Sequence, residues 1–336
     1  VKAIQHTLKI MRNKQEVIMC KKVLLIGGGG TLGSYASEEL LKKNCITDVI
    51  CLENKVSGNK NLHYFNMNAD LNGLTEFLKN RYYDGIINFI HYTDPESYKS
   101  VHRLLCEKTS HLVFLSSYRV YADLQHPVTE DSPQLYDVCS DELFLKTEDY
   151  AVPKSKCEHF IREESGTSNW TIVRPVISFS DKRLDIVTVS GHEAVDRTVR
   201  GEKIYLPIEA KNLTAGLDWA GNSGKLIADL SLNDRAFGET YTVSSAQNLT
   251  WGEVADIYTE LIGADFEWID TKAYSEYQHH TADIPYILKY DRLFDRKIDN
   301  AKILDVTGFT REDFISVKDG IKIELEKISS GQLQTP

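Results

Sequence analysis

Short apolar runs separated by helical patterns fill the first half of the chain. Continuous apolar runs are expected of parallel strands that are buried on both faces. Such runs occupy residues 23–26, 48–53, 63–68, 85–90, 111–115 and 170–173. Between most of them apolar residues recur with helical spacing, as do Leu32, Ala36 and Leu40. The alternation predicts right-handed crossovers and an α/β fold, with a parallel sheet that helices cover on both faces.

The second half lacks this alternation. Residues 179–215 are predicted as a loop and a helix without a core strand, whereas residues 239–243 return to a strand pattern. Thr250 and Glu253 have the spacing of a capping box, which opens a helix that ends at Gly263. We therefore predict an N-terminal extension at residues 1–18, a sheet-containing domain at 19–178 that the chain re-enters at about 216–248, and a smaller lobe formed by 179–215 and 249–336.

Composition argues against several classes of protein. Hydrophobic residues make up 42% of the 336 residues, which is enough for a full core. The net charge of -10 argues against nucleic acid as the main partner, because phosphate binding needs a basic face. No apolar stretch approaches the roughly 18 residues of a bilayer span, so no membrane association is predicted. The six cysteines show neither C-x-x-C nor zinc spacing, which favours a reducing cytoplasm and no metal site.

A glycine-rich turn follows the first apolar run and precedes the first helix. Its glycines are Gly27, Gly30 and Gly33. The N-terminus of a helix offers N–H groups and a partial positive charge, which suit a pyrophosphate. Gly27 would allow the tight turn, Gly30 would let the backbone approach the phosphates, and Gly33 would let the helix pack closely. The pattern is typical of a Rossmann-type domain that binds a dinucleotide.

Glu53 ends the second strand pattern, 26 residues after Gly27. A carboxylate there accepts hydrogen bonds from the adenosine ribose hydroxyls and repels a 2′-phosphate, which favours NAD over NADP. Lys55 would offset part of that repulsion. Asp70, after the third strand pattern, has two interpretations: it faces the adenine ring, or it caps the N-terminus of the next helix.

Tyr150 and Lys154 form the one Tyr-x-x-x-Lys of the chain. On a helix, residues four apart share a face. A free phenol has a pKa of about 10, and a nearby ammonium would lower it and also reach the nicotinamide ribose. Ser117 would hydrogen-bond the same substrate oxygen. Pro153 lacks an N–H and belongs in a first turn, so the helix should begin near Tyr150. The alternative is a surface Tyr and Lys on an amphipathic helix.

Taken in order, these motifs resemble the extended short-chain dehydrogenase/reductases, in particular the NAD-dependent epimerase/dehydratase family. The resemblance covers about residues 20–325. Its motifs are Gly27-x-x-Gly30-x-x-Gly33, Leu52-Glu53-Asn54, Ala69-Asp70-Leu71, Ser116-Ser117-x-x-Val120-Tyr121, Tyr150-x-x-x-Lys154, Val173-Arg174-Pro175, Asp299-Asn300-x-Lys302 and Thr307-Gly308-Phe309.

The resemblance implies a site. Ser117, Tyr150 and Lys154 would be catalytic, and the smaller lobe would bind a small-molecule substrate, a sugar or nucleotide sugar. The NAD site would comprise Gly27, Gly30, Thr31, Leu32, Gly33, Glu53, Asp70, Leu71, Phe89, Ile90, His91, Tyr150, Lys154, Pro175 and Val176. Substrate would contact Ser117, Tyr118, Arg119, Ser178 and Asn212. A homodimer is a further expectation.

The chain also departs from the family pattern. The stretch from His91 to His111 is short, so the family's active-site asparagine has no clear counterpart. Tyr118 and Arg119 stand where dehydratases have an acidic pair, which argues against dehydration. An arginine that often binds a nucleotide diphosphate is missing from residues 211–217, so recognition of that group stays open. The shortened loop is also similar to the chloroplast stem-loop RNA-binding branch.

Three functions remain. The first is epimerase-like NAD-dependent chemistry on a sugar or nucleotide sugar. The second is an NAD(P)-dependent ketoreductase or dehydrogenase of a non-nucleotide substrate. The third is a non-catalytic RNA-binding relative. The intact Tyr150–Lys154 pair and the acidic charge favour an enzyme.

Overall fold

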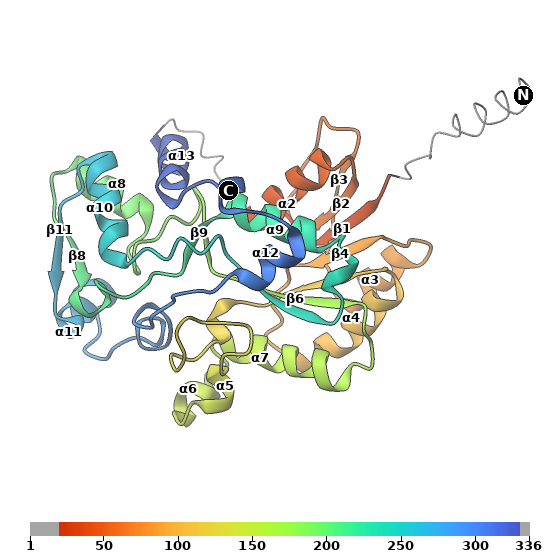
Figure 1. Cartoon of the computed structure of the whole chain (residues 1–336), viewed down its shortest axis with the longest axis horizontal. Coiled ribbons are helices and arrows are strands. Elements are labelled where there is room, and N and C mark those ends of the chain that lie inside the picture. Colours follow the sequence, from red (N-terminus) through yellow and green to blue (C-terminus); the bar gives the residue numbers. More distant parts are fainter. Residues whose placement is uncertain (1–19, 330–336) are drawn as a thin grey trace, which may run out of the picture.

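The computed structural model describes residues 20–329, and a seven-stranded parallel sheet forms its centre (Figure 1). The strand order is β10-β6-β5-β4-β1-β2-β3, and every neighbouring pair is parallel. The predicted α/β fold is therefore confirmed. The strands are β1 Lys22–Ile26, β2 Ile46–Cys51, β3 Leu62–Asn66, β4 Gly85–Asn88, β5 Leu112–Leu115, β6 Trp170–Pro175 and β10 Glu239–Val243. The direction of winding reverses between β1 and β4, where sheets of this kind bind ligands at the carboxyl ends of their strands.

Helices cover both faces of the sheet, as the apolar runs predicted. Within β1, Val23 and Leu25 belong to one apolar cluster, while Leu24 and Ile26 belong to the cluster on the other face. A strand in this position needs apolar side chains at successive residues. One face carries α2 Thr31–Lys42 and α9 Ala220–Leu230, and the opposite face carries α3 Leu71–Leu78, α4 Pro95–Glu107 and α7 Ala151–His159 (Figure 1).

A second group of elements lies beside the sheet, on the left of Figure 1. Its strands β8 Ile204–Pro207 and β11 Phe266–Ile269 pair in parallel, with α8 Gly191–Val199, α10 Trp251–Ile262 and α11 Thr271–His279 around them. The expectation of only a loop and a helix in residues 179–215 is wrong at β8. This strand is short, ends at Pro207 and has one strand partner, so it carries no long apolar run.

The predicted capping box of α10 is confirmed. Thr250 Oγ1 accepts a hydrogen bond from Glu253 N, and Glu253 Oε2 accepts one from Thr250 N. The helix ends at Gly263, which has a left-handed backbone with φ of 76°. These paired bonds satisfy two backbone N–H groups that a helix end leaves open.

The remaining elements are shorter strands, helices and turns. Strands β7 Ile177–Phe179 and β9 Leu217–Trp219 pair in parallel, and the chain also forms α5 Leu135–Val138, α6 Glu142–Lys146, α12 Ala301–Thr307 and α13 Val317–Ser329. Short 3-10 turns occur at Tyr118–Val120, Ile208–Ala210, Asp234–Ala236 and Arg311–Asp313, and π turns occur at Phe160–Glu164 and Leu288–Arg292. Among residues 20–329, no helix has the length and apolar character to cross a bilayer. The predicted extension at residues 1–18 lies outside the described residues.

Candidate active site

The glycine turn joins β1 to α2 at the carboxyl end of the sheet. Gly27 has a left-handed backbone with φ of 72°, and its N–H donates to Ile50 O at 2.9 Å. A Cβ at Gly33 would lie 2.3 Å from the carbonyl oxygen of Gly28, so only glycine lets α2 pack on the turn. At Gly30, an added Cβ would have no atom of the described chain within 4 Å other than those of the adjoining residues. The turn is therefore closed on its Gly33 side and open at Gly30, where α2 begins.

A cavity of about 210 Å³ opens beside this turn. Glu53 lies two residues beyond the end of β2, and an added Cβ at Gly29 would be 2.5 Å from its Oε2 atom. Lys55 Nζ donates to the carbonyl oxygen of Gly29. A carboxylate and an ammonium thus flank the turn together. The cavity is lined by Gly27, Gly29, Gly30, Ile50, Cys51, Leu52, Glu53, Met67, Asn68, Ala69 and Ile90.

Asp70 caps the helix that follows β3. Its Oδ1 accepts from Gly73 N at 2.8 Å, which is the N-cap interpretation of this residue. Ala69 lines the cavity beside the glycine turn, whereas Asp70 is not among the described lining residues, and Leu71 is exposed at the first position of α3. The cap uses one carboxylate oxygen, and the adenine contact of Asp70 stays a prediction.

Tyr150 and Lys154 lie at the start of α7, as predicted. Tyr150 is the N-cap residue, and Pro153 falls within the first turn. The Lys154 side chain is 1% exposed, and its Nζ donates to the carbonyl oxygens of Leu115 and Ile90. Burial lowers the pKa of Lys154 to about 8. Its ammonium lies 5.8 Å from the centre of the Tyr150 ring.

The electrostatics of Tyr150 depend on burial and on nearby charges. Burial raises the pKa of its phenol, and the charges that act against this rise are those of Arg119 and Arg183. The charge of Lys154 is not among the effects that set this shift, and its expected lowering of the Tyr150 pKa stays a prediction. The Lys154 ammonium donates to the carbonyl oxygens of Leu115 and Ile90, and it lies 5.8 Å from the Tyr150 ring centre, compared with 5.4 Å for the guanidinium carbon of Arg119.

A second cavity of about 210 Å³ brings most of the predicted site residues together. Ser117, at the end of β5, accepts a hydrogen bond from Arg119 N at 3.2 Å. Asn212 is exposed on the turn before β9 and is not among the described residues around this cavity. The lining residues are Leu32, Leu115, Ser116, Ser117, Tyr118, Arg119, Tyr150, Pro175, Val176, Ile177, Ser178 and Arg183.

The other residues assigned to the cofactor lie close to these two cavities or support them. The His91 ring stacks on Tyr150 with centroids 4.6 Å apart, and burial, with the charges of Lys154 and Arg119, lowers the pKa of His91 to about 4. Its imidazole is therefore neutral at pH 7. Thr31 Oγ1 lies 3.1 Å from Ser180 Oγ, within hydrogen-bond distance. Phe89 packs against the apolar cluster under α2.

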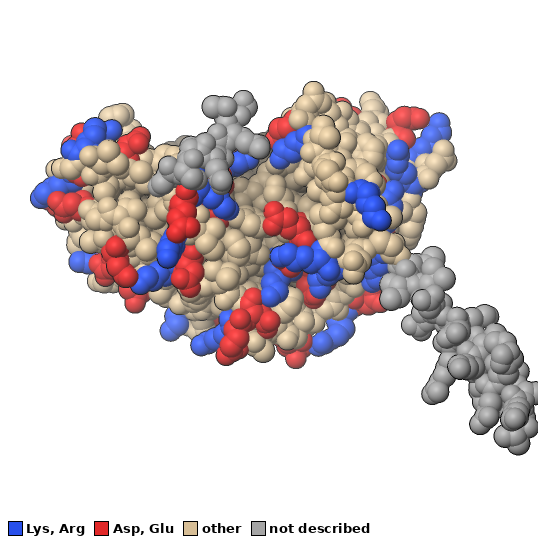
Figure 2. All heavy atoms as spheres, turned by 90° about the horizontal axis from the view of Figure 1, so that it is seen from above, with Lys and Arg blue, Asp and Glu red and all other residues tan. Residues whose placement is uncertain are grey.

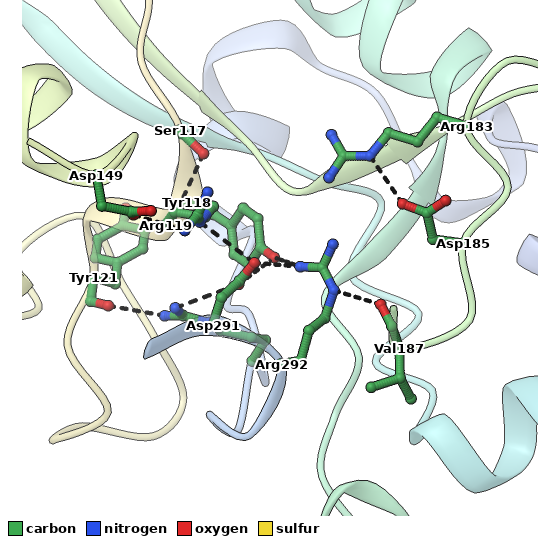
Figure 3. Close-up of polar contacts among 11 residues, drawn as sticks. Ser117, Tyr118, Arg119, Tyr121, Asp149, Arg183, Asp185, Val187, Asp291 and Arg292 are labelled. Atoms are coloured by element: carbon green, nitrogen blue, oxygen red, sulfur yellow. Dashed lines mark hydrogen bonds and ion pairs between the residues drawn. The ribbon is translucent and has the colours of Figure 1, made fainter. Parts of the chain in front are cut away.

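A buried group of charges beside the second cavity was not predicted (Figure 3). Tyr118 lines the cavity, but its hydroxyl donates to Asp291 Oδ1 at 2.6 Å. Burial alone would raise the pKa of Asp291, yet Arg292, Arg296 and Arg119 hold it below its usual value. Arg119 also donates to Asp149 at 2.8 Å. The hydroxyl of Tyr118 therefore donates within this group, and a contact of Tyr118 with substrate stays a prediction.

Sequence reasoning missed Asp149, Arg183, Asp291 and Arg292. Asp149 directly precedes Tyr150, and Arg183 follows the Val173-Arg174-Pro175 motif, so these two lay near recognised signals. Asp291 and Arg292 lie in a stretch without a motif, far along the chain. Among residues 20–329, no group of three or more His, Cys, Asp or Glu side chains is arranged to hold a metal ion.

Comparisons with known proteins identify the fold. Neither the protein-family models nor the curated proteins yield a match to this sequence. Solved structures do match. The Bordetella bronchiseptica enzyme WbmG in complex with NAD and UDP has a TM-score of 0.69 at 17% identity, over 94% of this chain and 96% of that one. An epimerase from Methanothermobacter thermautotrophicus has a TM-score of 0.68 at 13% identity, over 93% of both chains.

A third structure agrees with these two. The UDP-glucose 4-epimerase of Thermotoga maritima, solved with UDP-glucose, has a TM-score of 0.64 at 13% identity, over 93% of this chain and all of that one. At such identities the likeness establishes the shared fold. The fold expected from the resemblance to the NAD-dependent epimerase/dehydratase family is thus confirmed along almost the entire chain.

Proposed function

We propose that this chain is an NAD-dependent epimerase-like oxidoreductase that acts on a hydroxyl or keto carbon of a sugar or nucleotide sugar. The observation that carries the proposal is the second cavity, which Ser117 and Tyr150 line together, with Lys154 buried behind them. The cavity lies at the carboxyl ends of β5 and β6, beside the glycine turn. Structures of the same fold include WbmG with NAD and an epimerase with UDP-glucose.

The residues beside the glycine turn fit a dinucleotide. Gly30 leaves open space at the start of α2, and no side chain of the described residues caps that helix end. A pyrophosphate there would meet backbone N–H groups and the positive end of the helix dipole. Glu53 would accept from the adenosine ribose, and Lys154 would lie toward the nicotinamide ribose. The chemistry that bound NAD supplies is reversible acceptance of a hydride.

The side chains of the second cavity would handle the proton. Tyr150 would take the proton of the substrate hydroxyl and later return it, and Ser117 would hold the same oxygen by a hydrogen bond. General acid–base catalysis of this kind contributes about 10²–10⁴-fold to a rate. Arg119 and Arg183 would favour the phenolate form of Tyr150 that takes this proton, because both oppose the rise of the Tyr150 pKa.

Replacing Glu53 with Ala should weaken a preference for NAD(H) over NADP(H). The carboxylate borders the glycine turn, where it would accept from the ribose hydroxyls and repel a 2′-phosphate. Calorimetric titration of both cofactors against the parent chain and Glu53→Ala measures the preference. Lys55→Ala is the matched control, and it should strengthen the preference because a cation leaves the same place. Tighter binding of NADP(H) by the parent chain would refute the role of Glu53.

The proposed reaction predicts that no net cofactor is consumed. With NAD and UDP-glucose or another nucleotide sugar, the inverted sugar should appear in NMR spectra while nicotinamide absorbance stays constant. A change in absorbance that is stoichiometric with product would instead support the ketoreductase or dehydrogenase alternative. Deuterium from solvent next to the reacting carbon would point to dehydration, against which Tyr118 and Arg119 argue.

The RNA-binding alternative lacks a comparable observation. On the face shown in Figure 2, the coloured Lys and Arg side chains lie among Asp and Glu side chains rather than in a continuous basic area. Affinity for RNA rests largely on contacts of basic residues with phosphates. The charge of -10 works against such contacts over the chain as a whole.

A further inference from the structure

Two arginines line the same cavity as Tyr150 and Ser117. Arg119 belongs to the turn after β5, and Arg183 belongs to the loop after β7. They approach from different parts of the chain: in Figure 3 the guanidinium end of Arg183 points toward the side on which Ser117 and Arg119 lie. The Arg119 side chain is 13% exposed and therefore forms part of the cavity wall. The Arg183 side chain is 53% exposed and therefore borders the solvent.

Arg119 is fixed by contacts with neighbouring residues, but not all of its N–H donors form hydrogen bonds. Its Nη2 donates to Asp149 Oδ1, and its backbone N–H donates to Ser117 Oγ. Its Nε lies 3.4 Å from Asp291 Oδ2, yet this buried N–H makes no hydrogen bond within the described residues. A guanidinium carries five N–H donors in a fixed fork. The wall therefore presents a fixed cation whose hydrogen-bonding capacity is only partly used.

The nearby carboxylates do not balance these cations. Asp291 is in ion-pair contact with three arginines, Arg119, Arg292 and Arg296. Arg119 also pairs with Asp149, and Arg183 pairs with Asp185, so four arginines face three carboxylates in these ion pairs. Arg183 reaches Asp185 through Nε alone at 3.3 Å, which leaves its two terminal nitrogens on the cavity side. A surplus of positive charge thus remains where the substrate would lie, and both arginines act on the Tyr150 phenol.

We propose that Arg119 and Arg183 together bind an anionic group of the substrate, a carboxylate or a phosphate, close to the carbon on which Tyr150 acts. This inference rests on the proposed function, because it takes that cavity as the substrate site. Paired guanidinium groups match the planar oxygens of a carboxylate or phosphate and form strong charge-assisted hydrogen bonds. Since Ser117 and Arg119 line the same cavity, a substrate oxygen held by Ser117 would leave neighbouring substituents within the cavity that Arg119 also lines. The substrate would be an acidic sugar derivative.

The test compares UDP-glucuronic acid, UDP-glucose and UDP by calorimetry, each with and without NAD. The first variant is Arg183→Gln, because a half-exposed side chain contributes little to the folded core, and Arg119→Gln is the second. Arg200→Gln is the matched control, since Arg200 is 54% exposed and pairs with Glu202 two residues on, as Arg183 pairs with Asp185. Arg200 lies outside the described lining of the cavity.

The proposal expects a loss of at least about tenfold in affinity for an anionic probe in Arg183→Gln, and no change in Arg200→Gln. If the loss is confined to UDP-glucuronic acid, the arginines bind a sugar carboxylate; if all three probes lose affinity equally, they bind the diphosphate. Unchanged affinity for every probe in both variants, or no probe binding to the parent chain, would overturn it. Titration of NAD alone reports separately on the proposed function, so the two failures can be told apart.

Discussion

Tyr150→Phe is expected to lower turnover by about 10²–10⁴-fold while NAD(H) binding changes little. The substitution removes only the hydroxyl, and the ring keeps its stacking on His91 at 4.6 Å and its packing near Arg119. The cofactor turn, Glu53 and Lys154 are untouched. Steady-state turnover with the substrate that the parent chain converts, together with calorimetric titration of NAD, measures the two effects.

Two further variants make this result specific. Tyr82→Phe is the control, because Tyr82 is exposed and its hydroxyl is 3.4 Å from Ser110, outside both cavities in the described chain; it should leave turnover unchanged. Lys154→Ala should reduce both turnover and NAD binding, since Lys154 would serve Tyr150 and the ribose. If Tyr150→Phe retains full turnover, Tyr150 is not the proton-transfer residue.

The sheet could be predicted because a strand that is buried on both faces appears in the sequence as a continuous apolar run. In β1 successive residues enter opposite apolar clusters, so polar residues are excluded along the run. β8 carries no such long run: it has only four residues, of which Tyr205 is half-buried, and its pairing partner β11 lies some sixty residues further on. A strand with a single remote partner is defined by tertiary contacts, which local periodicity does not encode.

In the candidate site, too, features set by local sequence were predicted, whereas contacts between remote residues were not. The glycine turn and the position of Tyr150 at the start of α7 follow from local rules of turns and helix starts, so the sequence predicted them. The hydrogen bond between Tyr118 and Asp291 joins residues 173 positions apart, so no local sequence pattern predicts it. Lys154 shows the limit within a correct motif. Helical spacing predicted that it shares a face with Tyr150, but not that carbonyls of two strand ends would hold its ammonium.

Gly33→Ala should damage both the fold and NAD binding, whereas Gly30→Ala should damage binding alone. A Cβ at Gly33 would lie 2.3 Å from Gly28 O and 2.5 Å from Gly28 Cα. These are backbone atoms of the turn, so the turn must shift to make room. Overpacking of this kind costs about 1–3 kcal/mol of folding free energy. The displaced turn should also lose its match to a pyrophosphate, which lowers NAD affinity by more than about tenfold.

At Gly30, in contrast to Gly33, there is room for an added Cβ within the folded chain. Apart from the adjoining residues, no atom of the described chain lies within 4 Å of an added Cβ, so the thermal unfolding temperature should be nearly unchanged. The methyl group would instead fill the space through which phosphates approach α2, and NAD affinity should fall. Gly58→Ala, another position with open space around the added Cβ, should alter neither quantity. Thermal unfolding without cofactor and calorimetric NAD titration separate these outcomes. Full NAD affinity in both Gly30→Ala and Gly33→Ala would mean that the turn does not hold the dinucleotide.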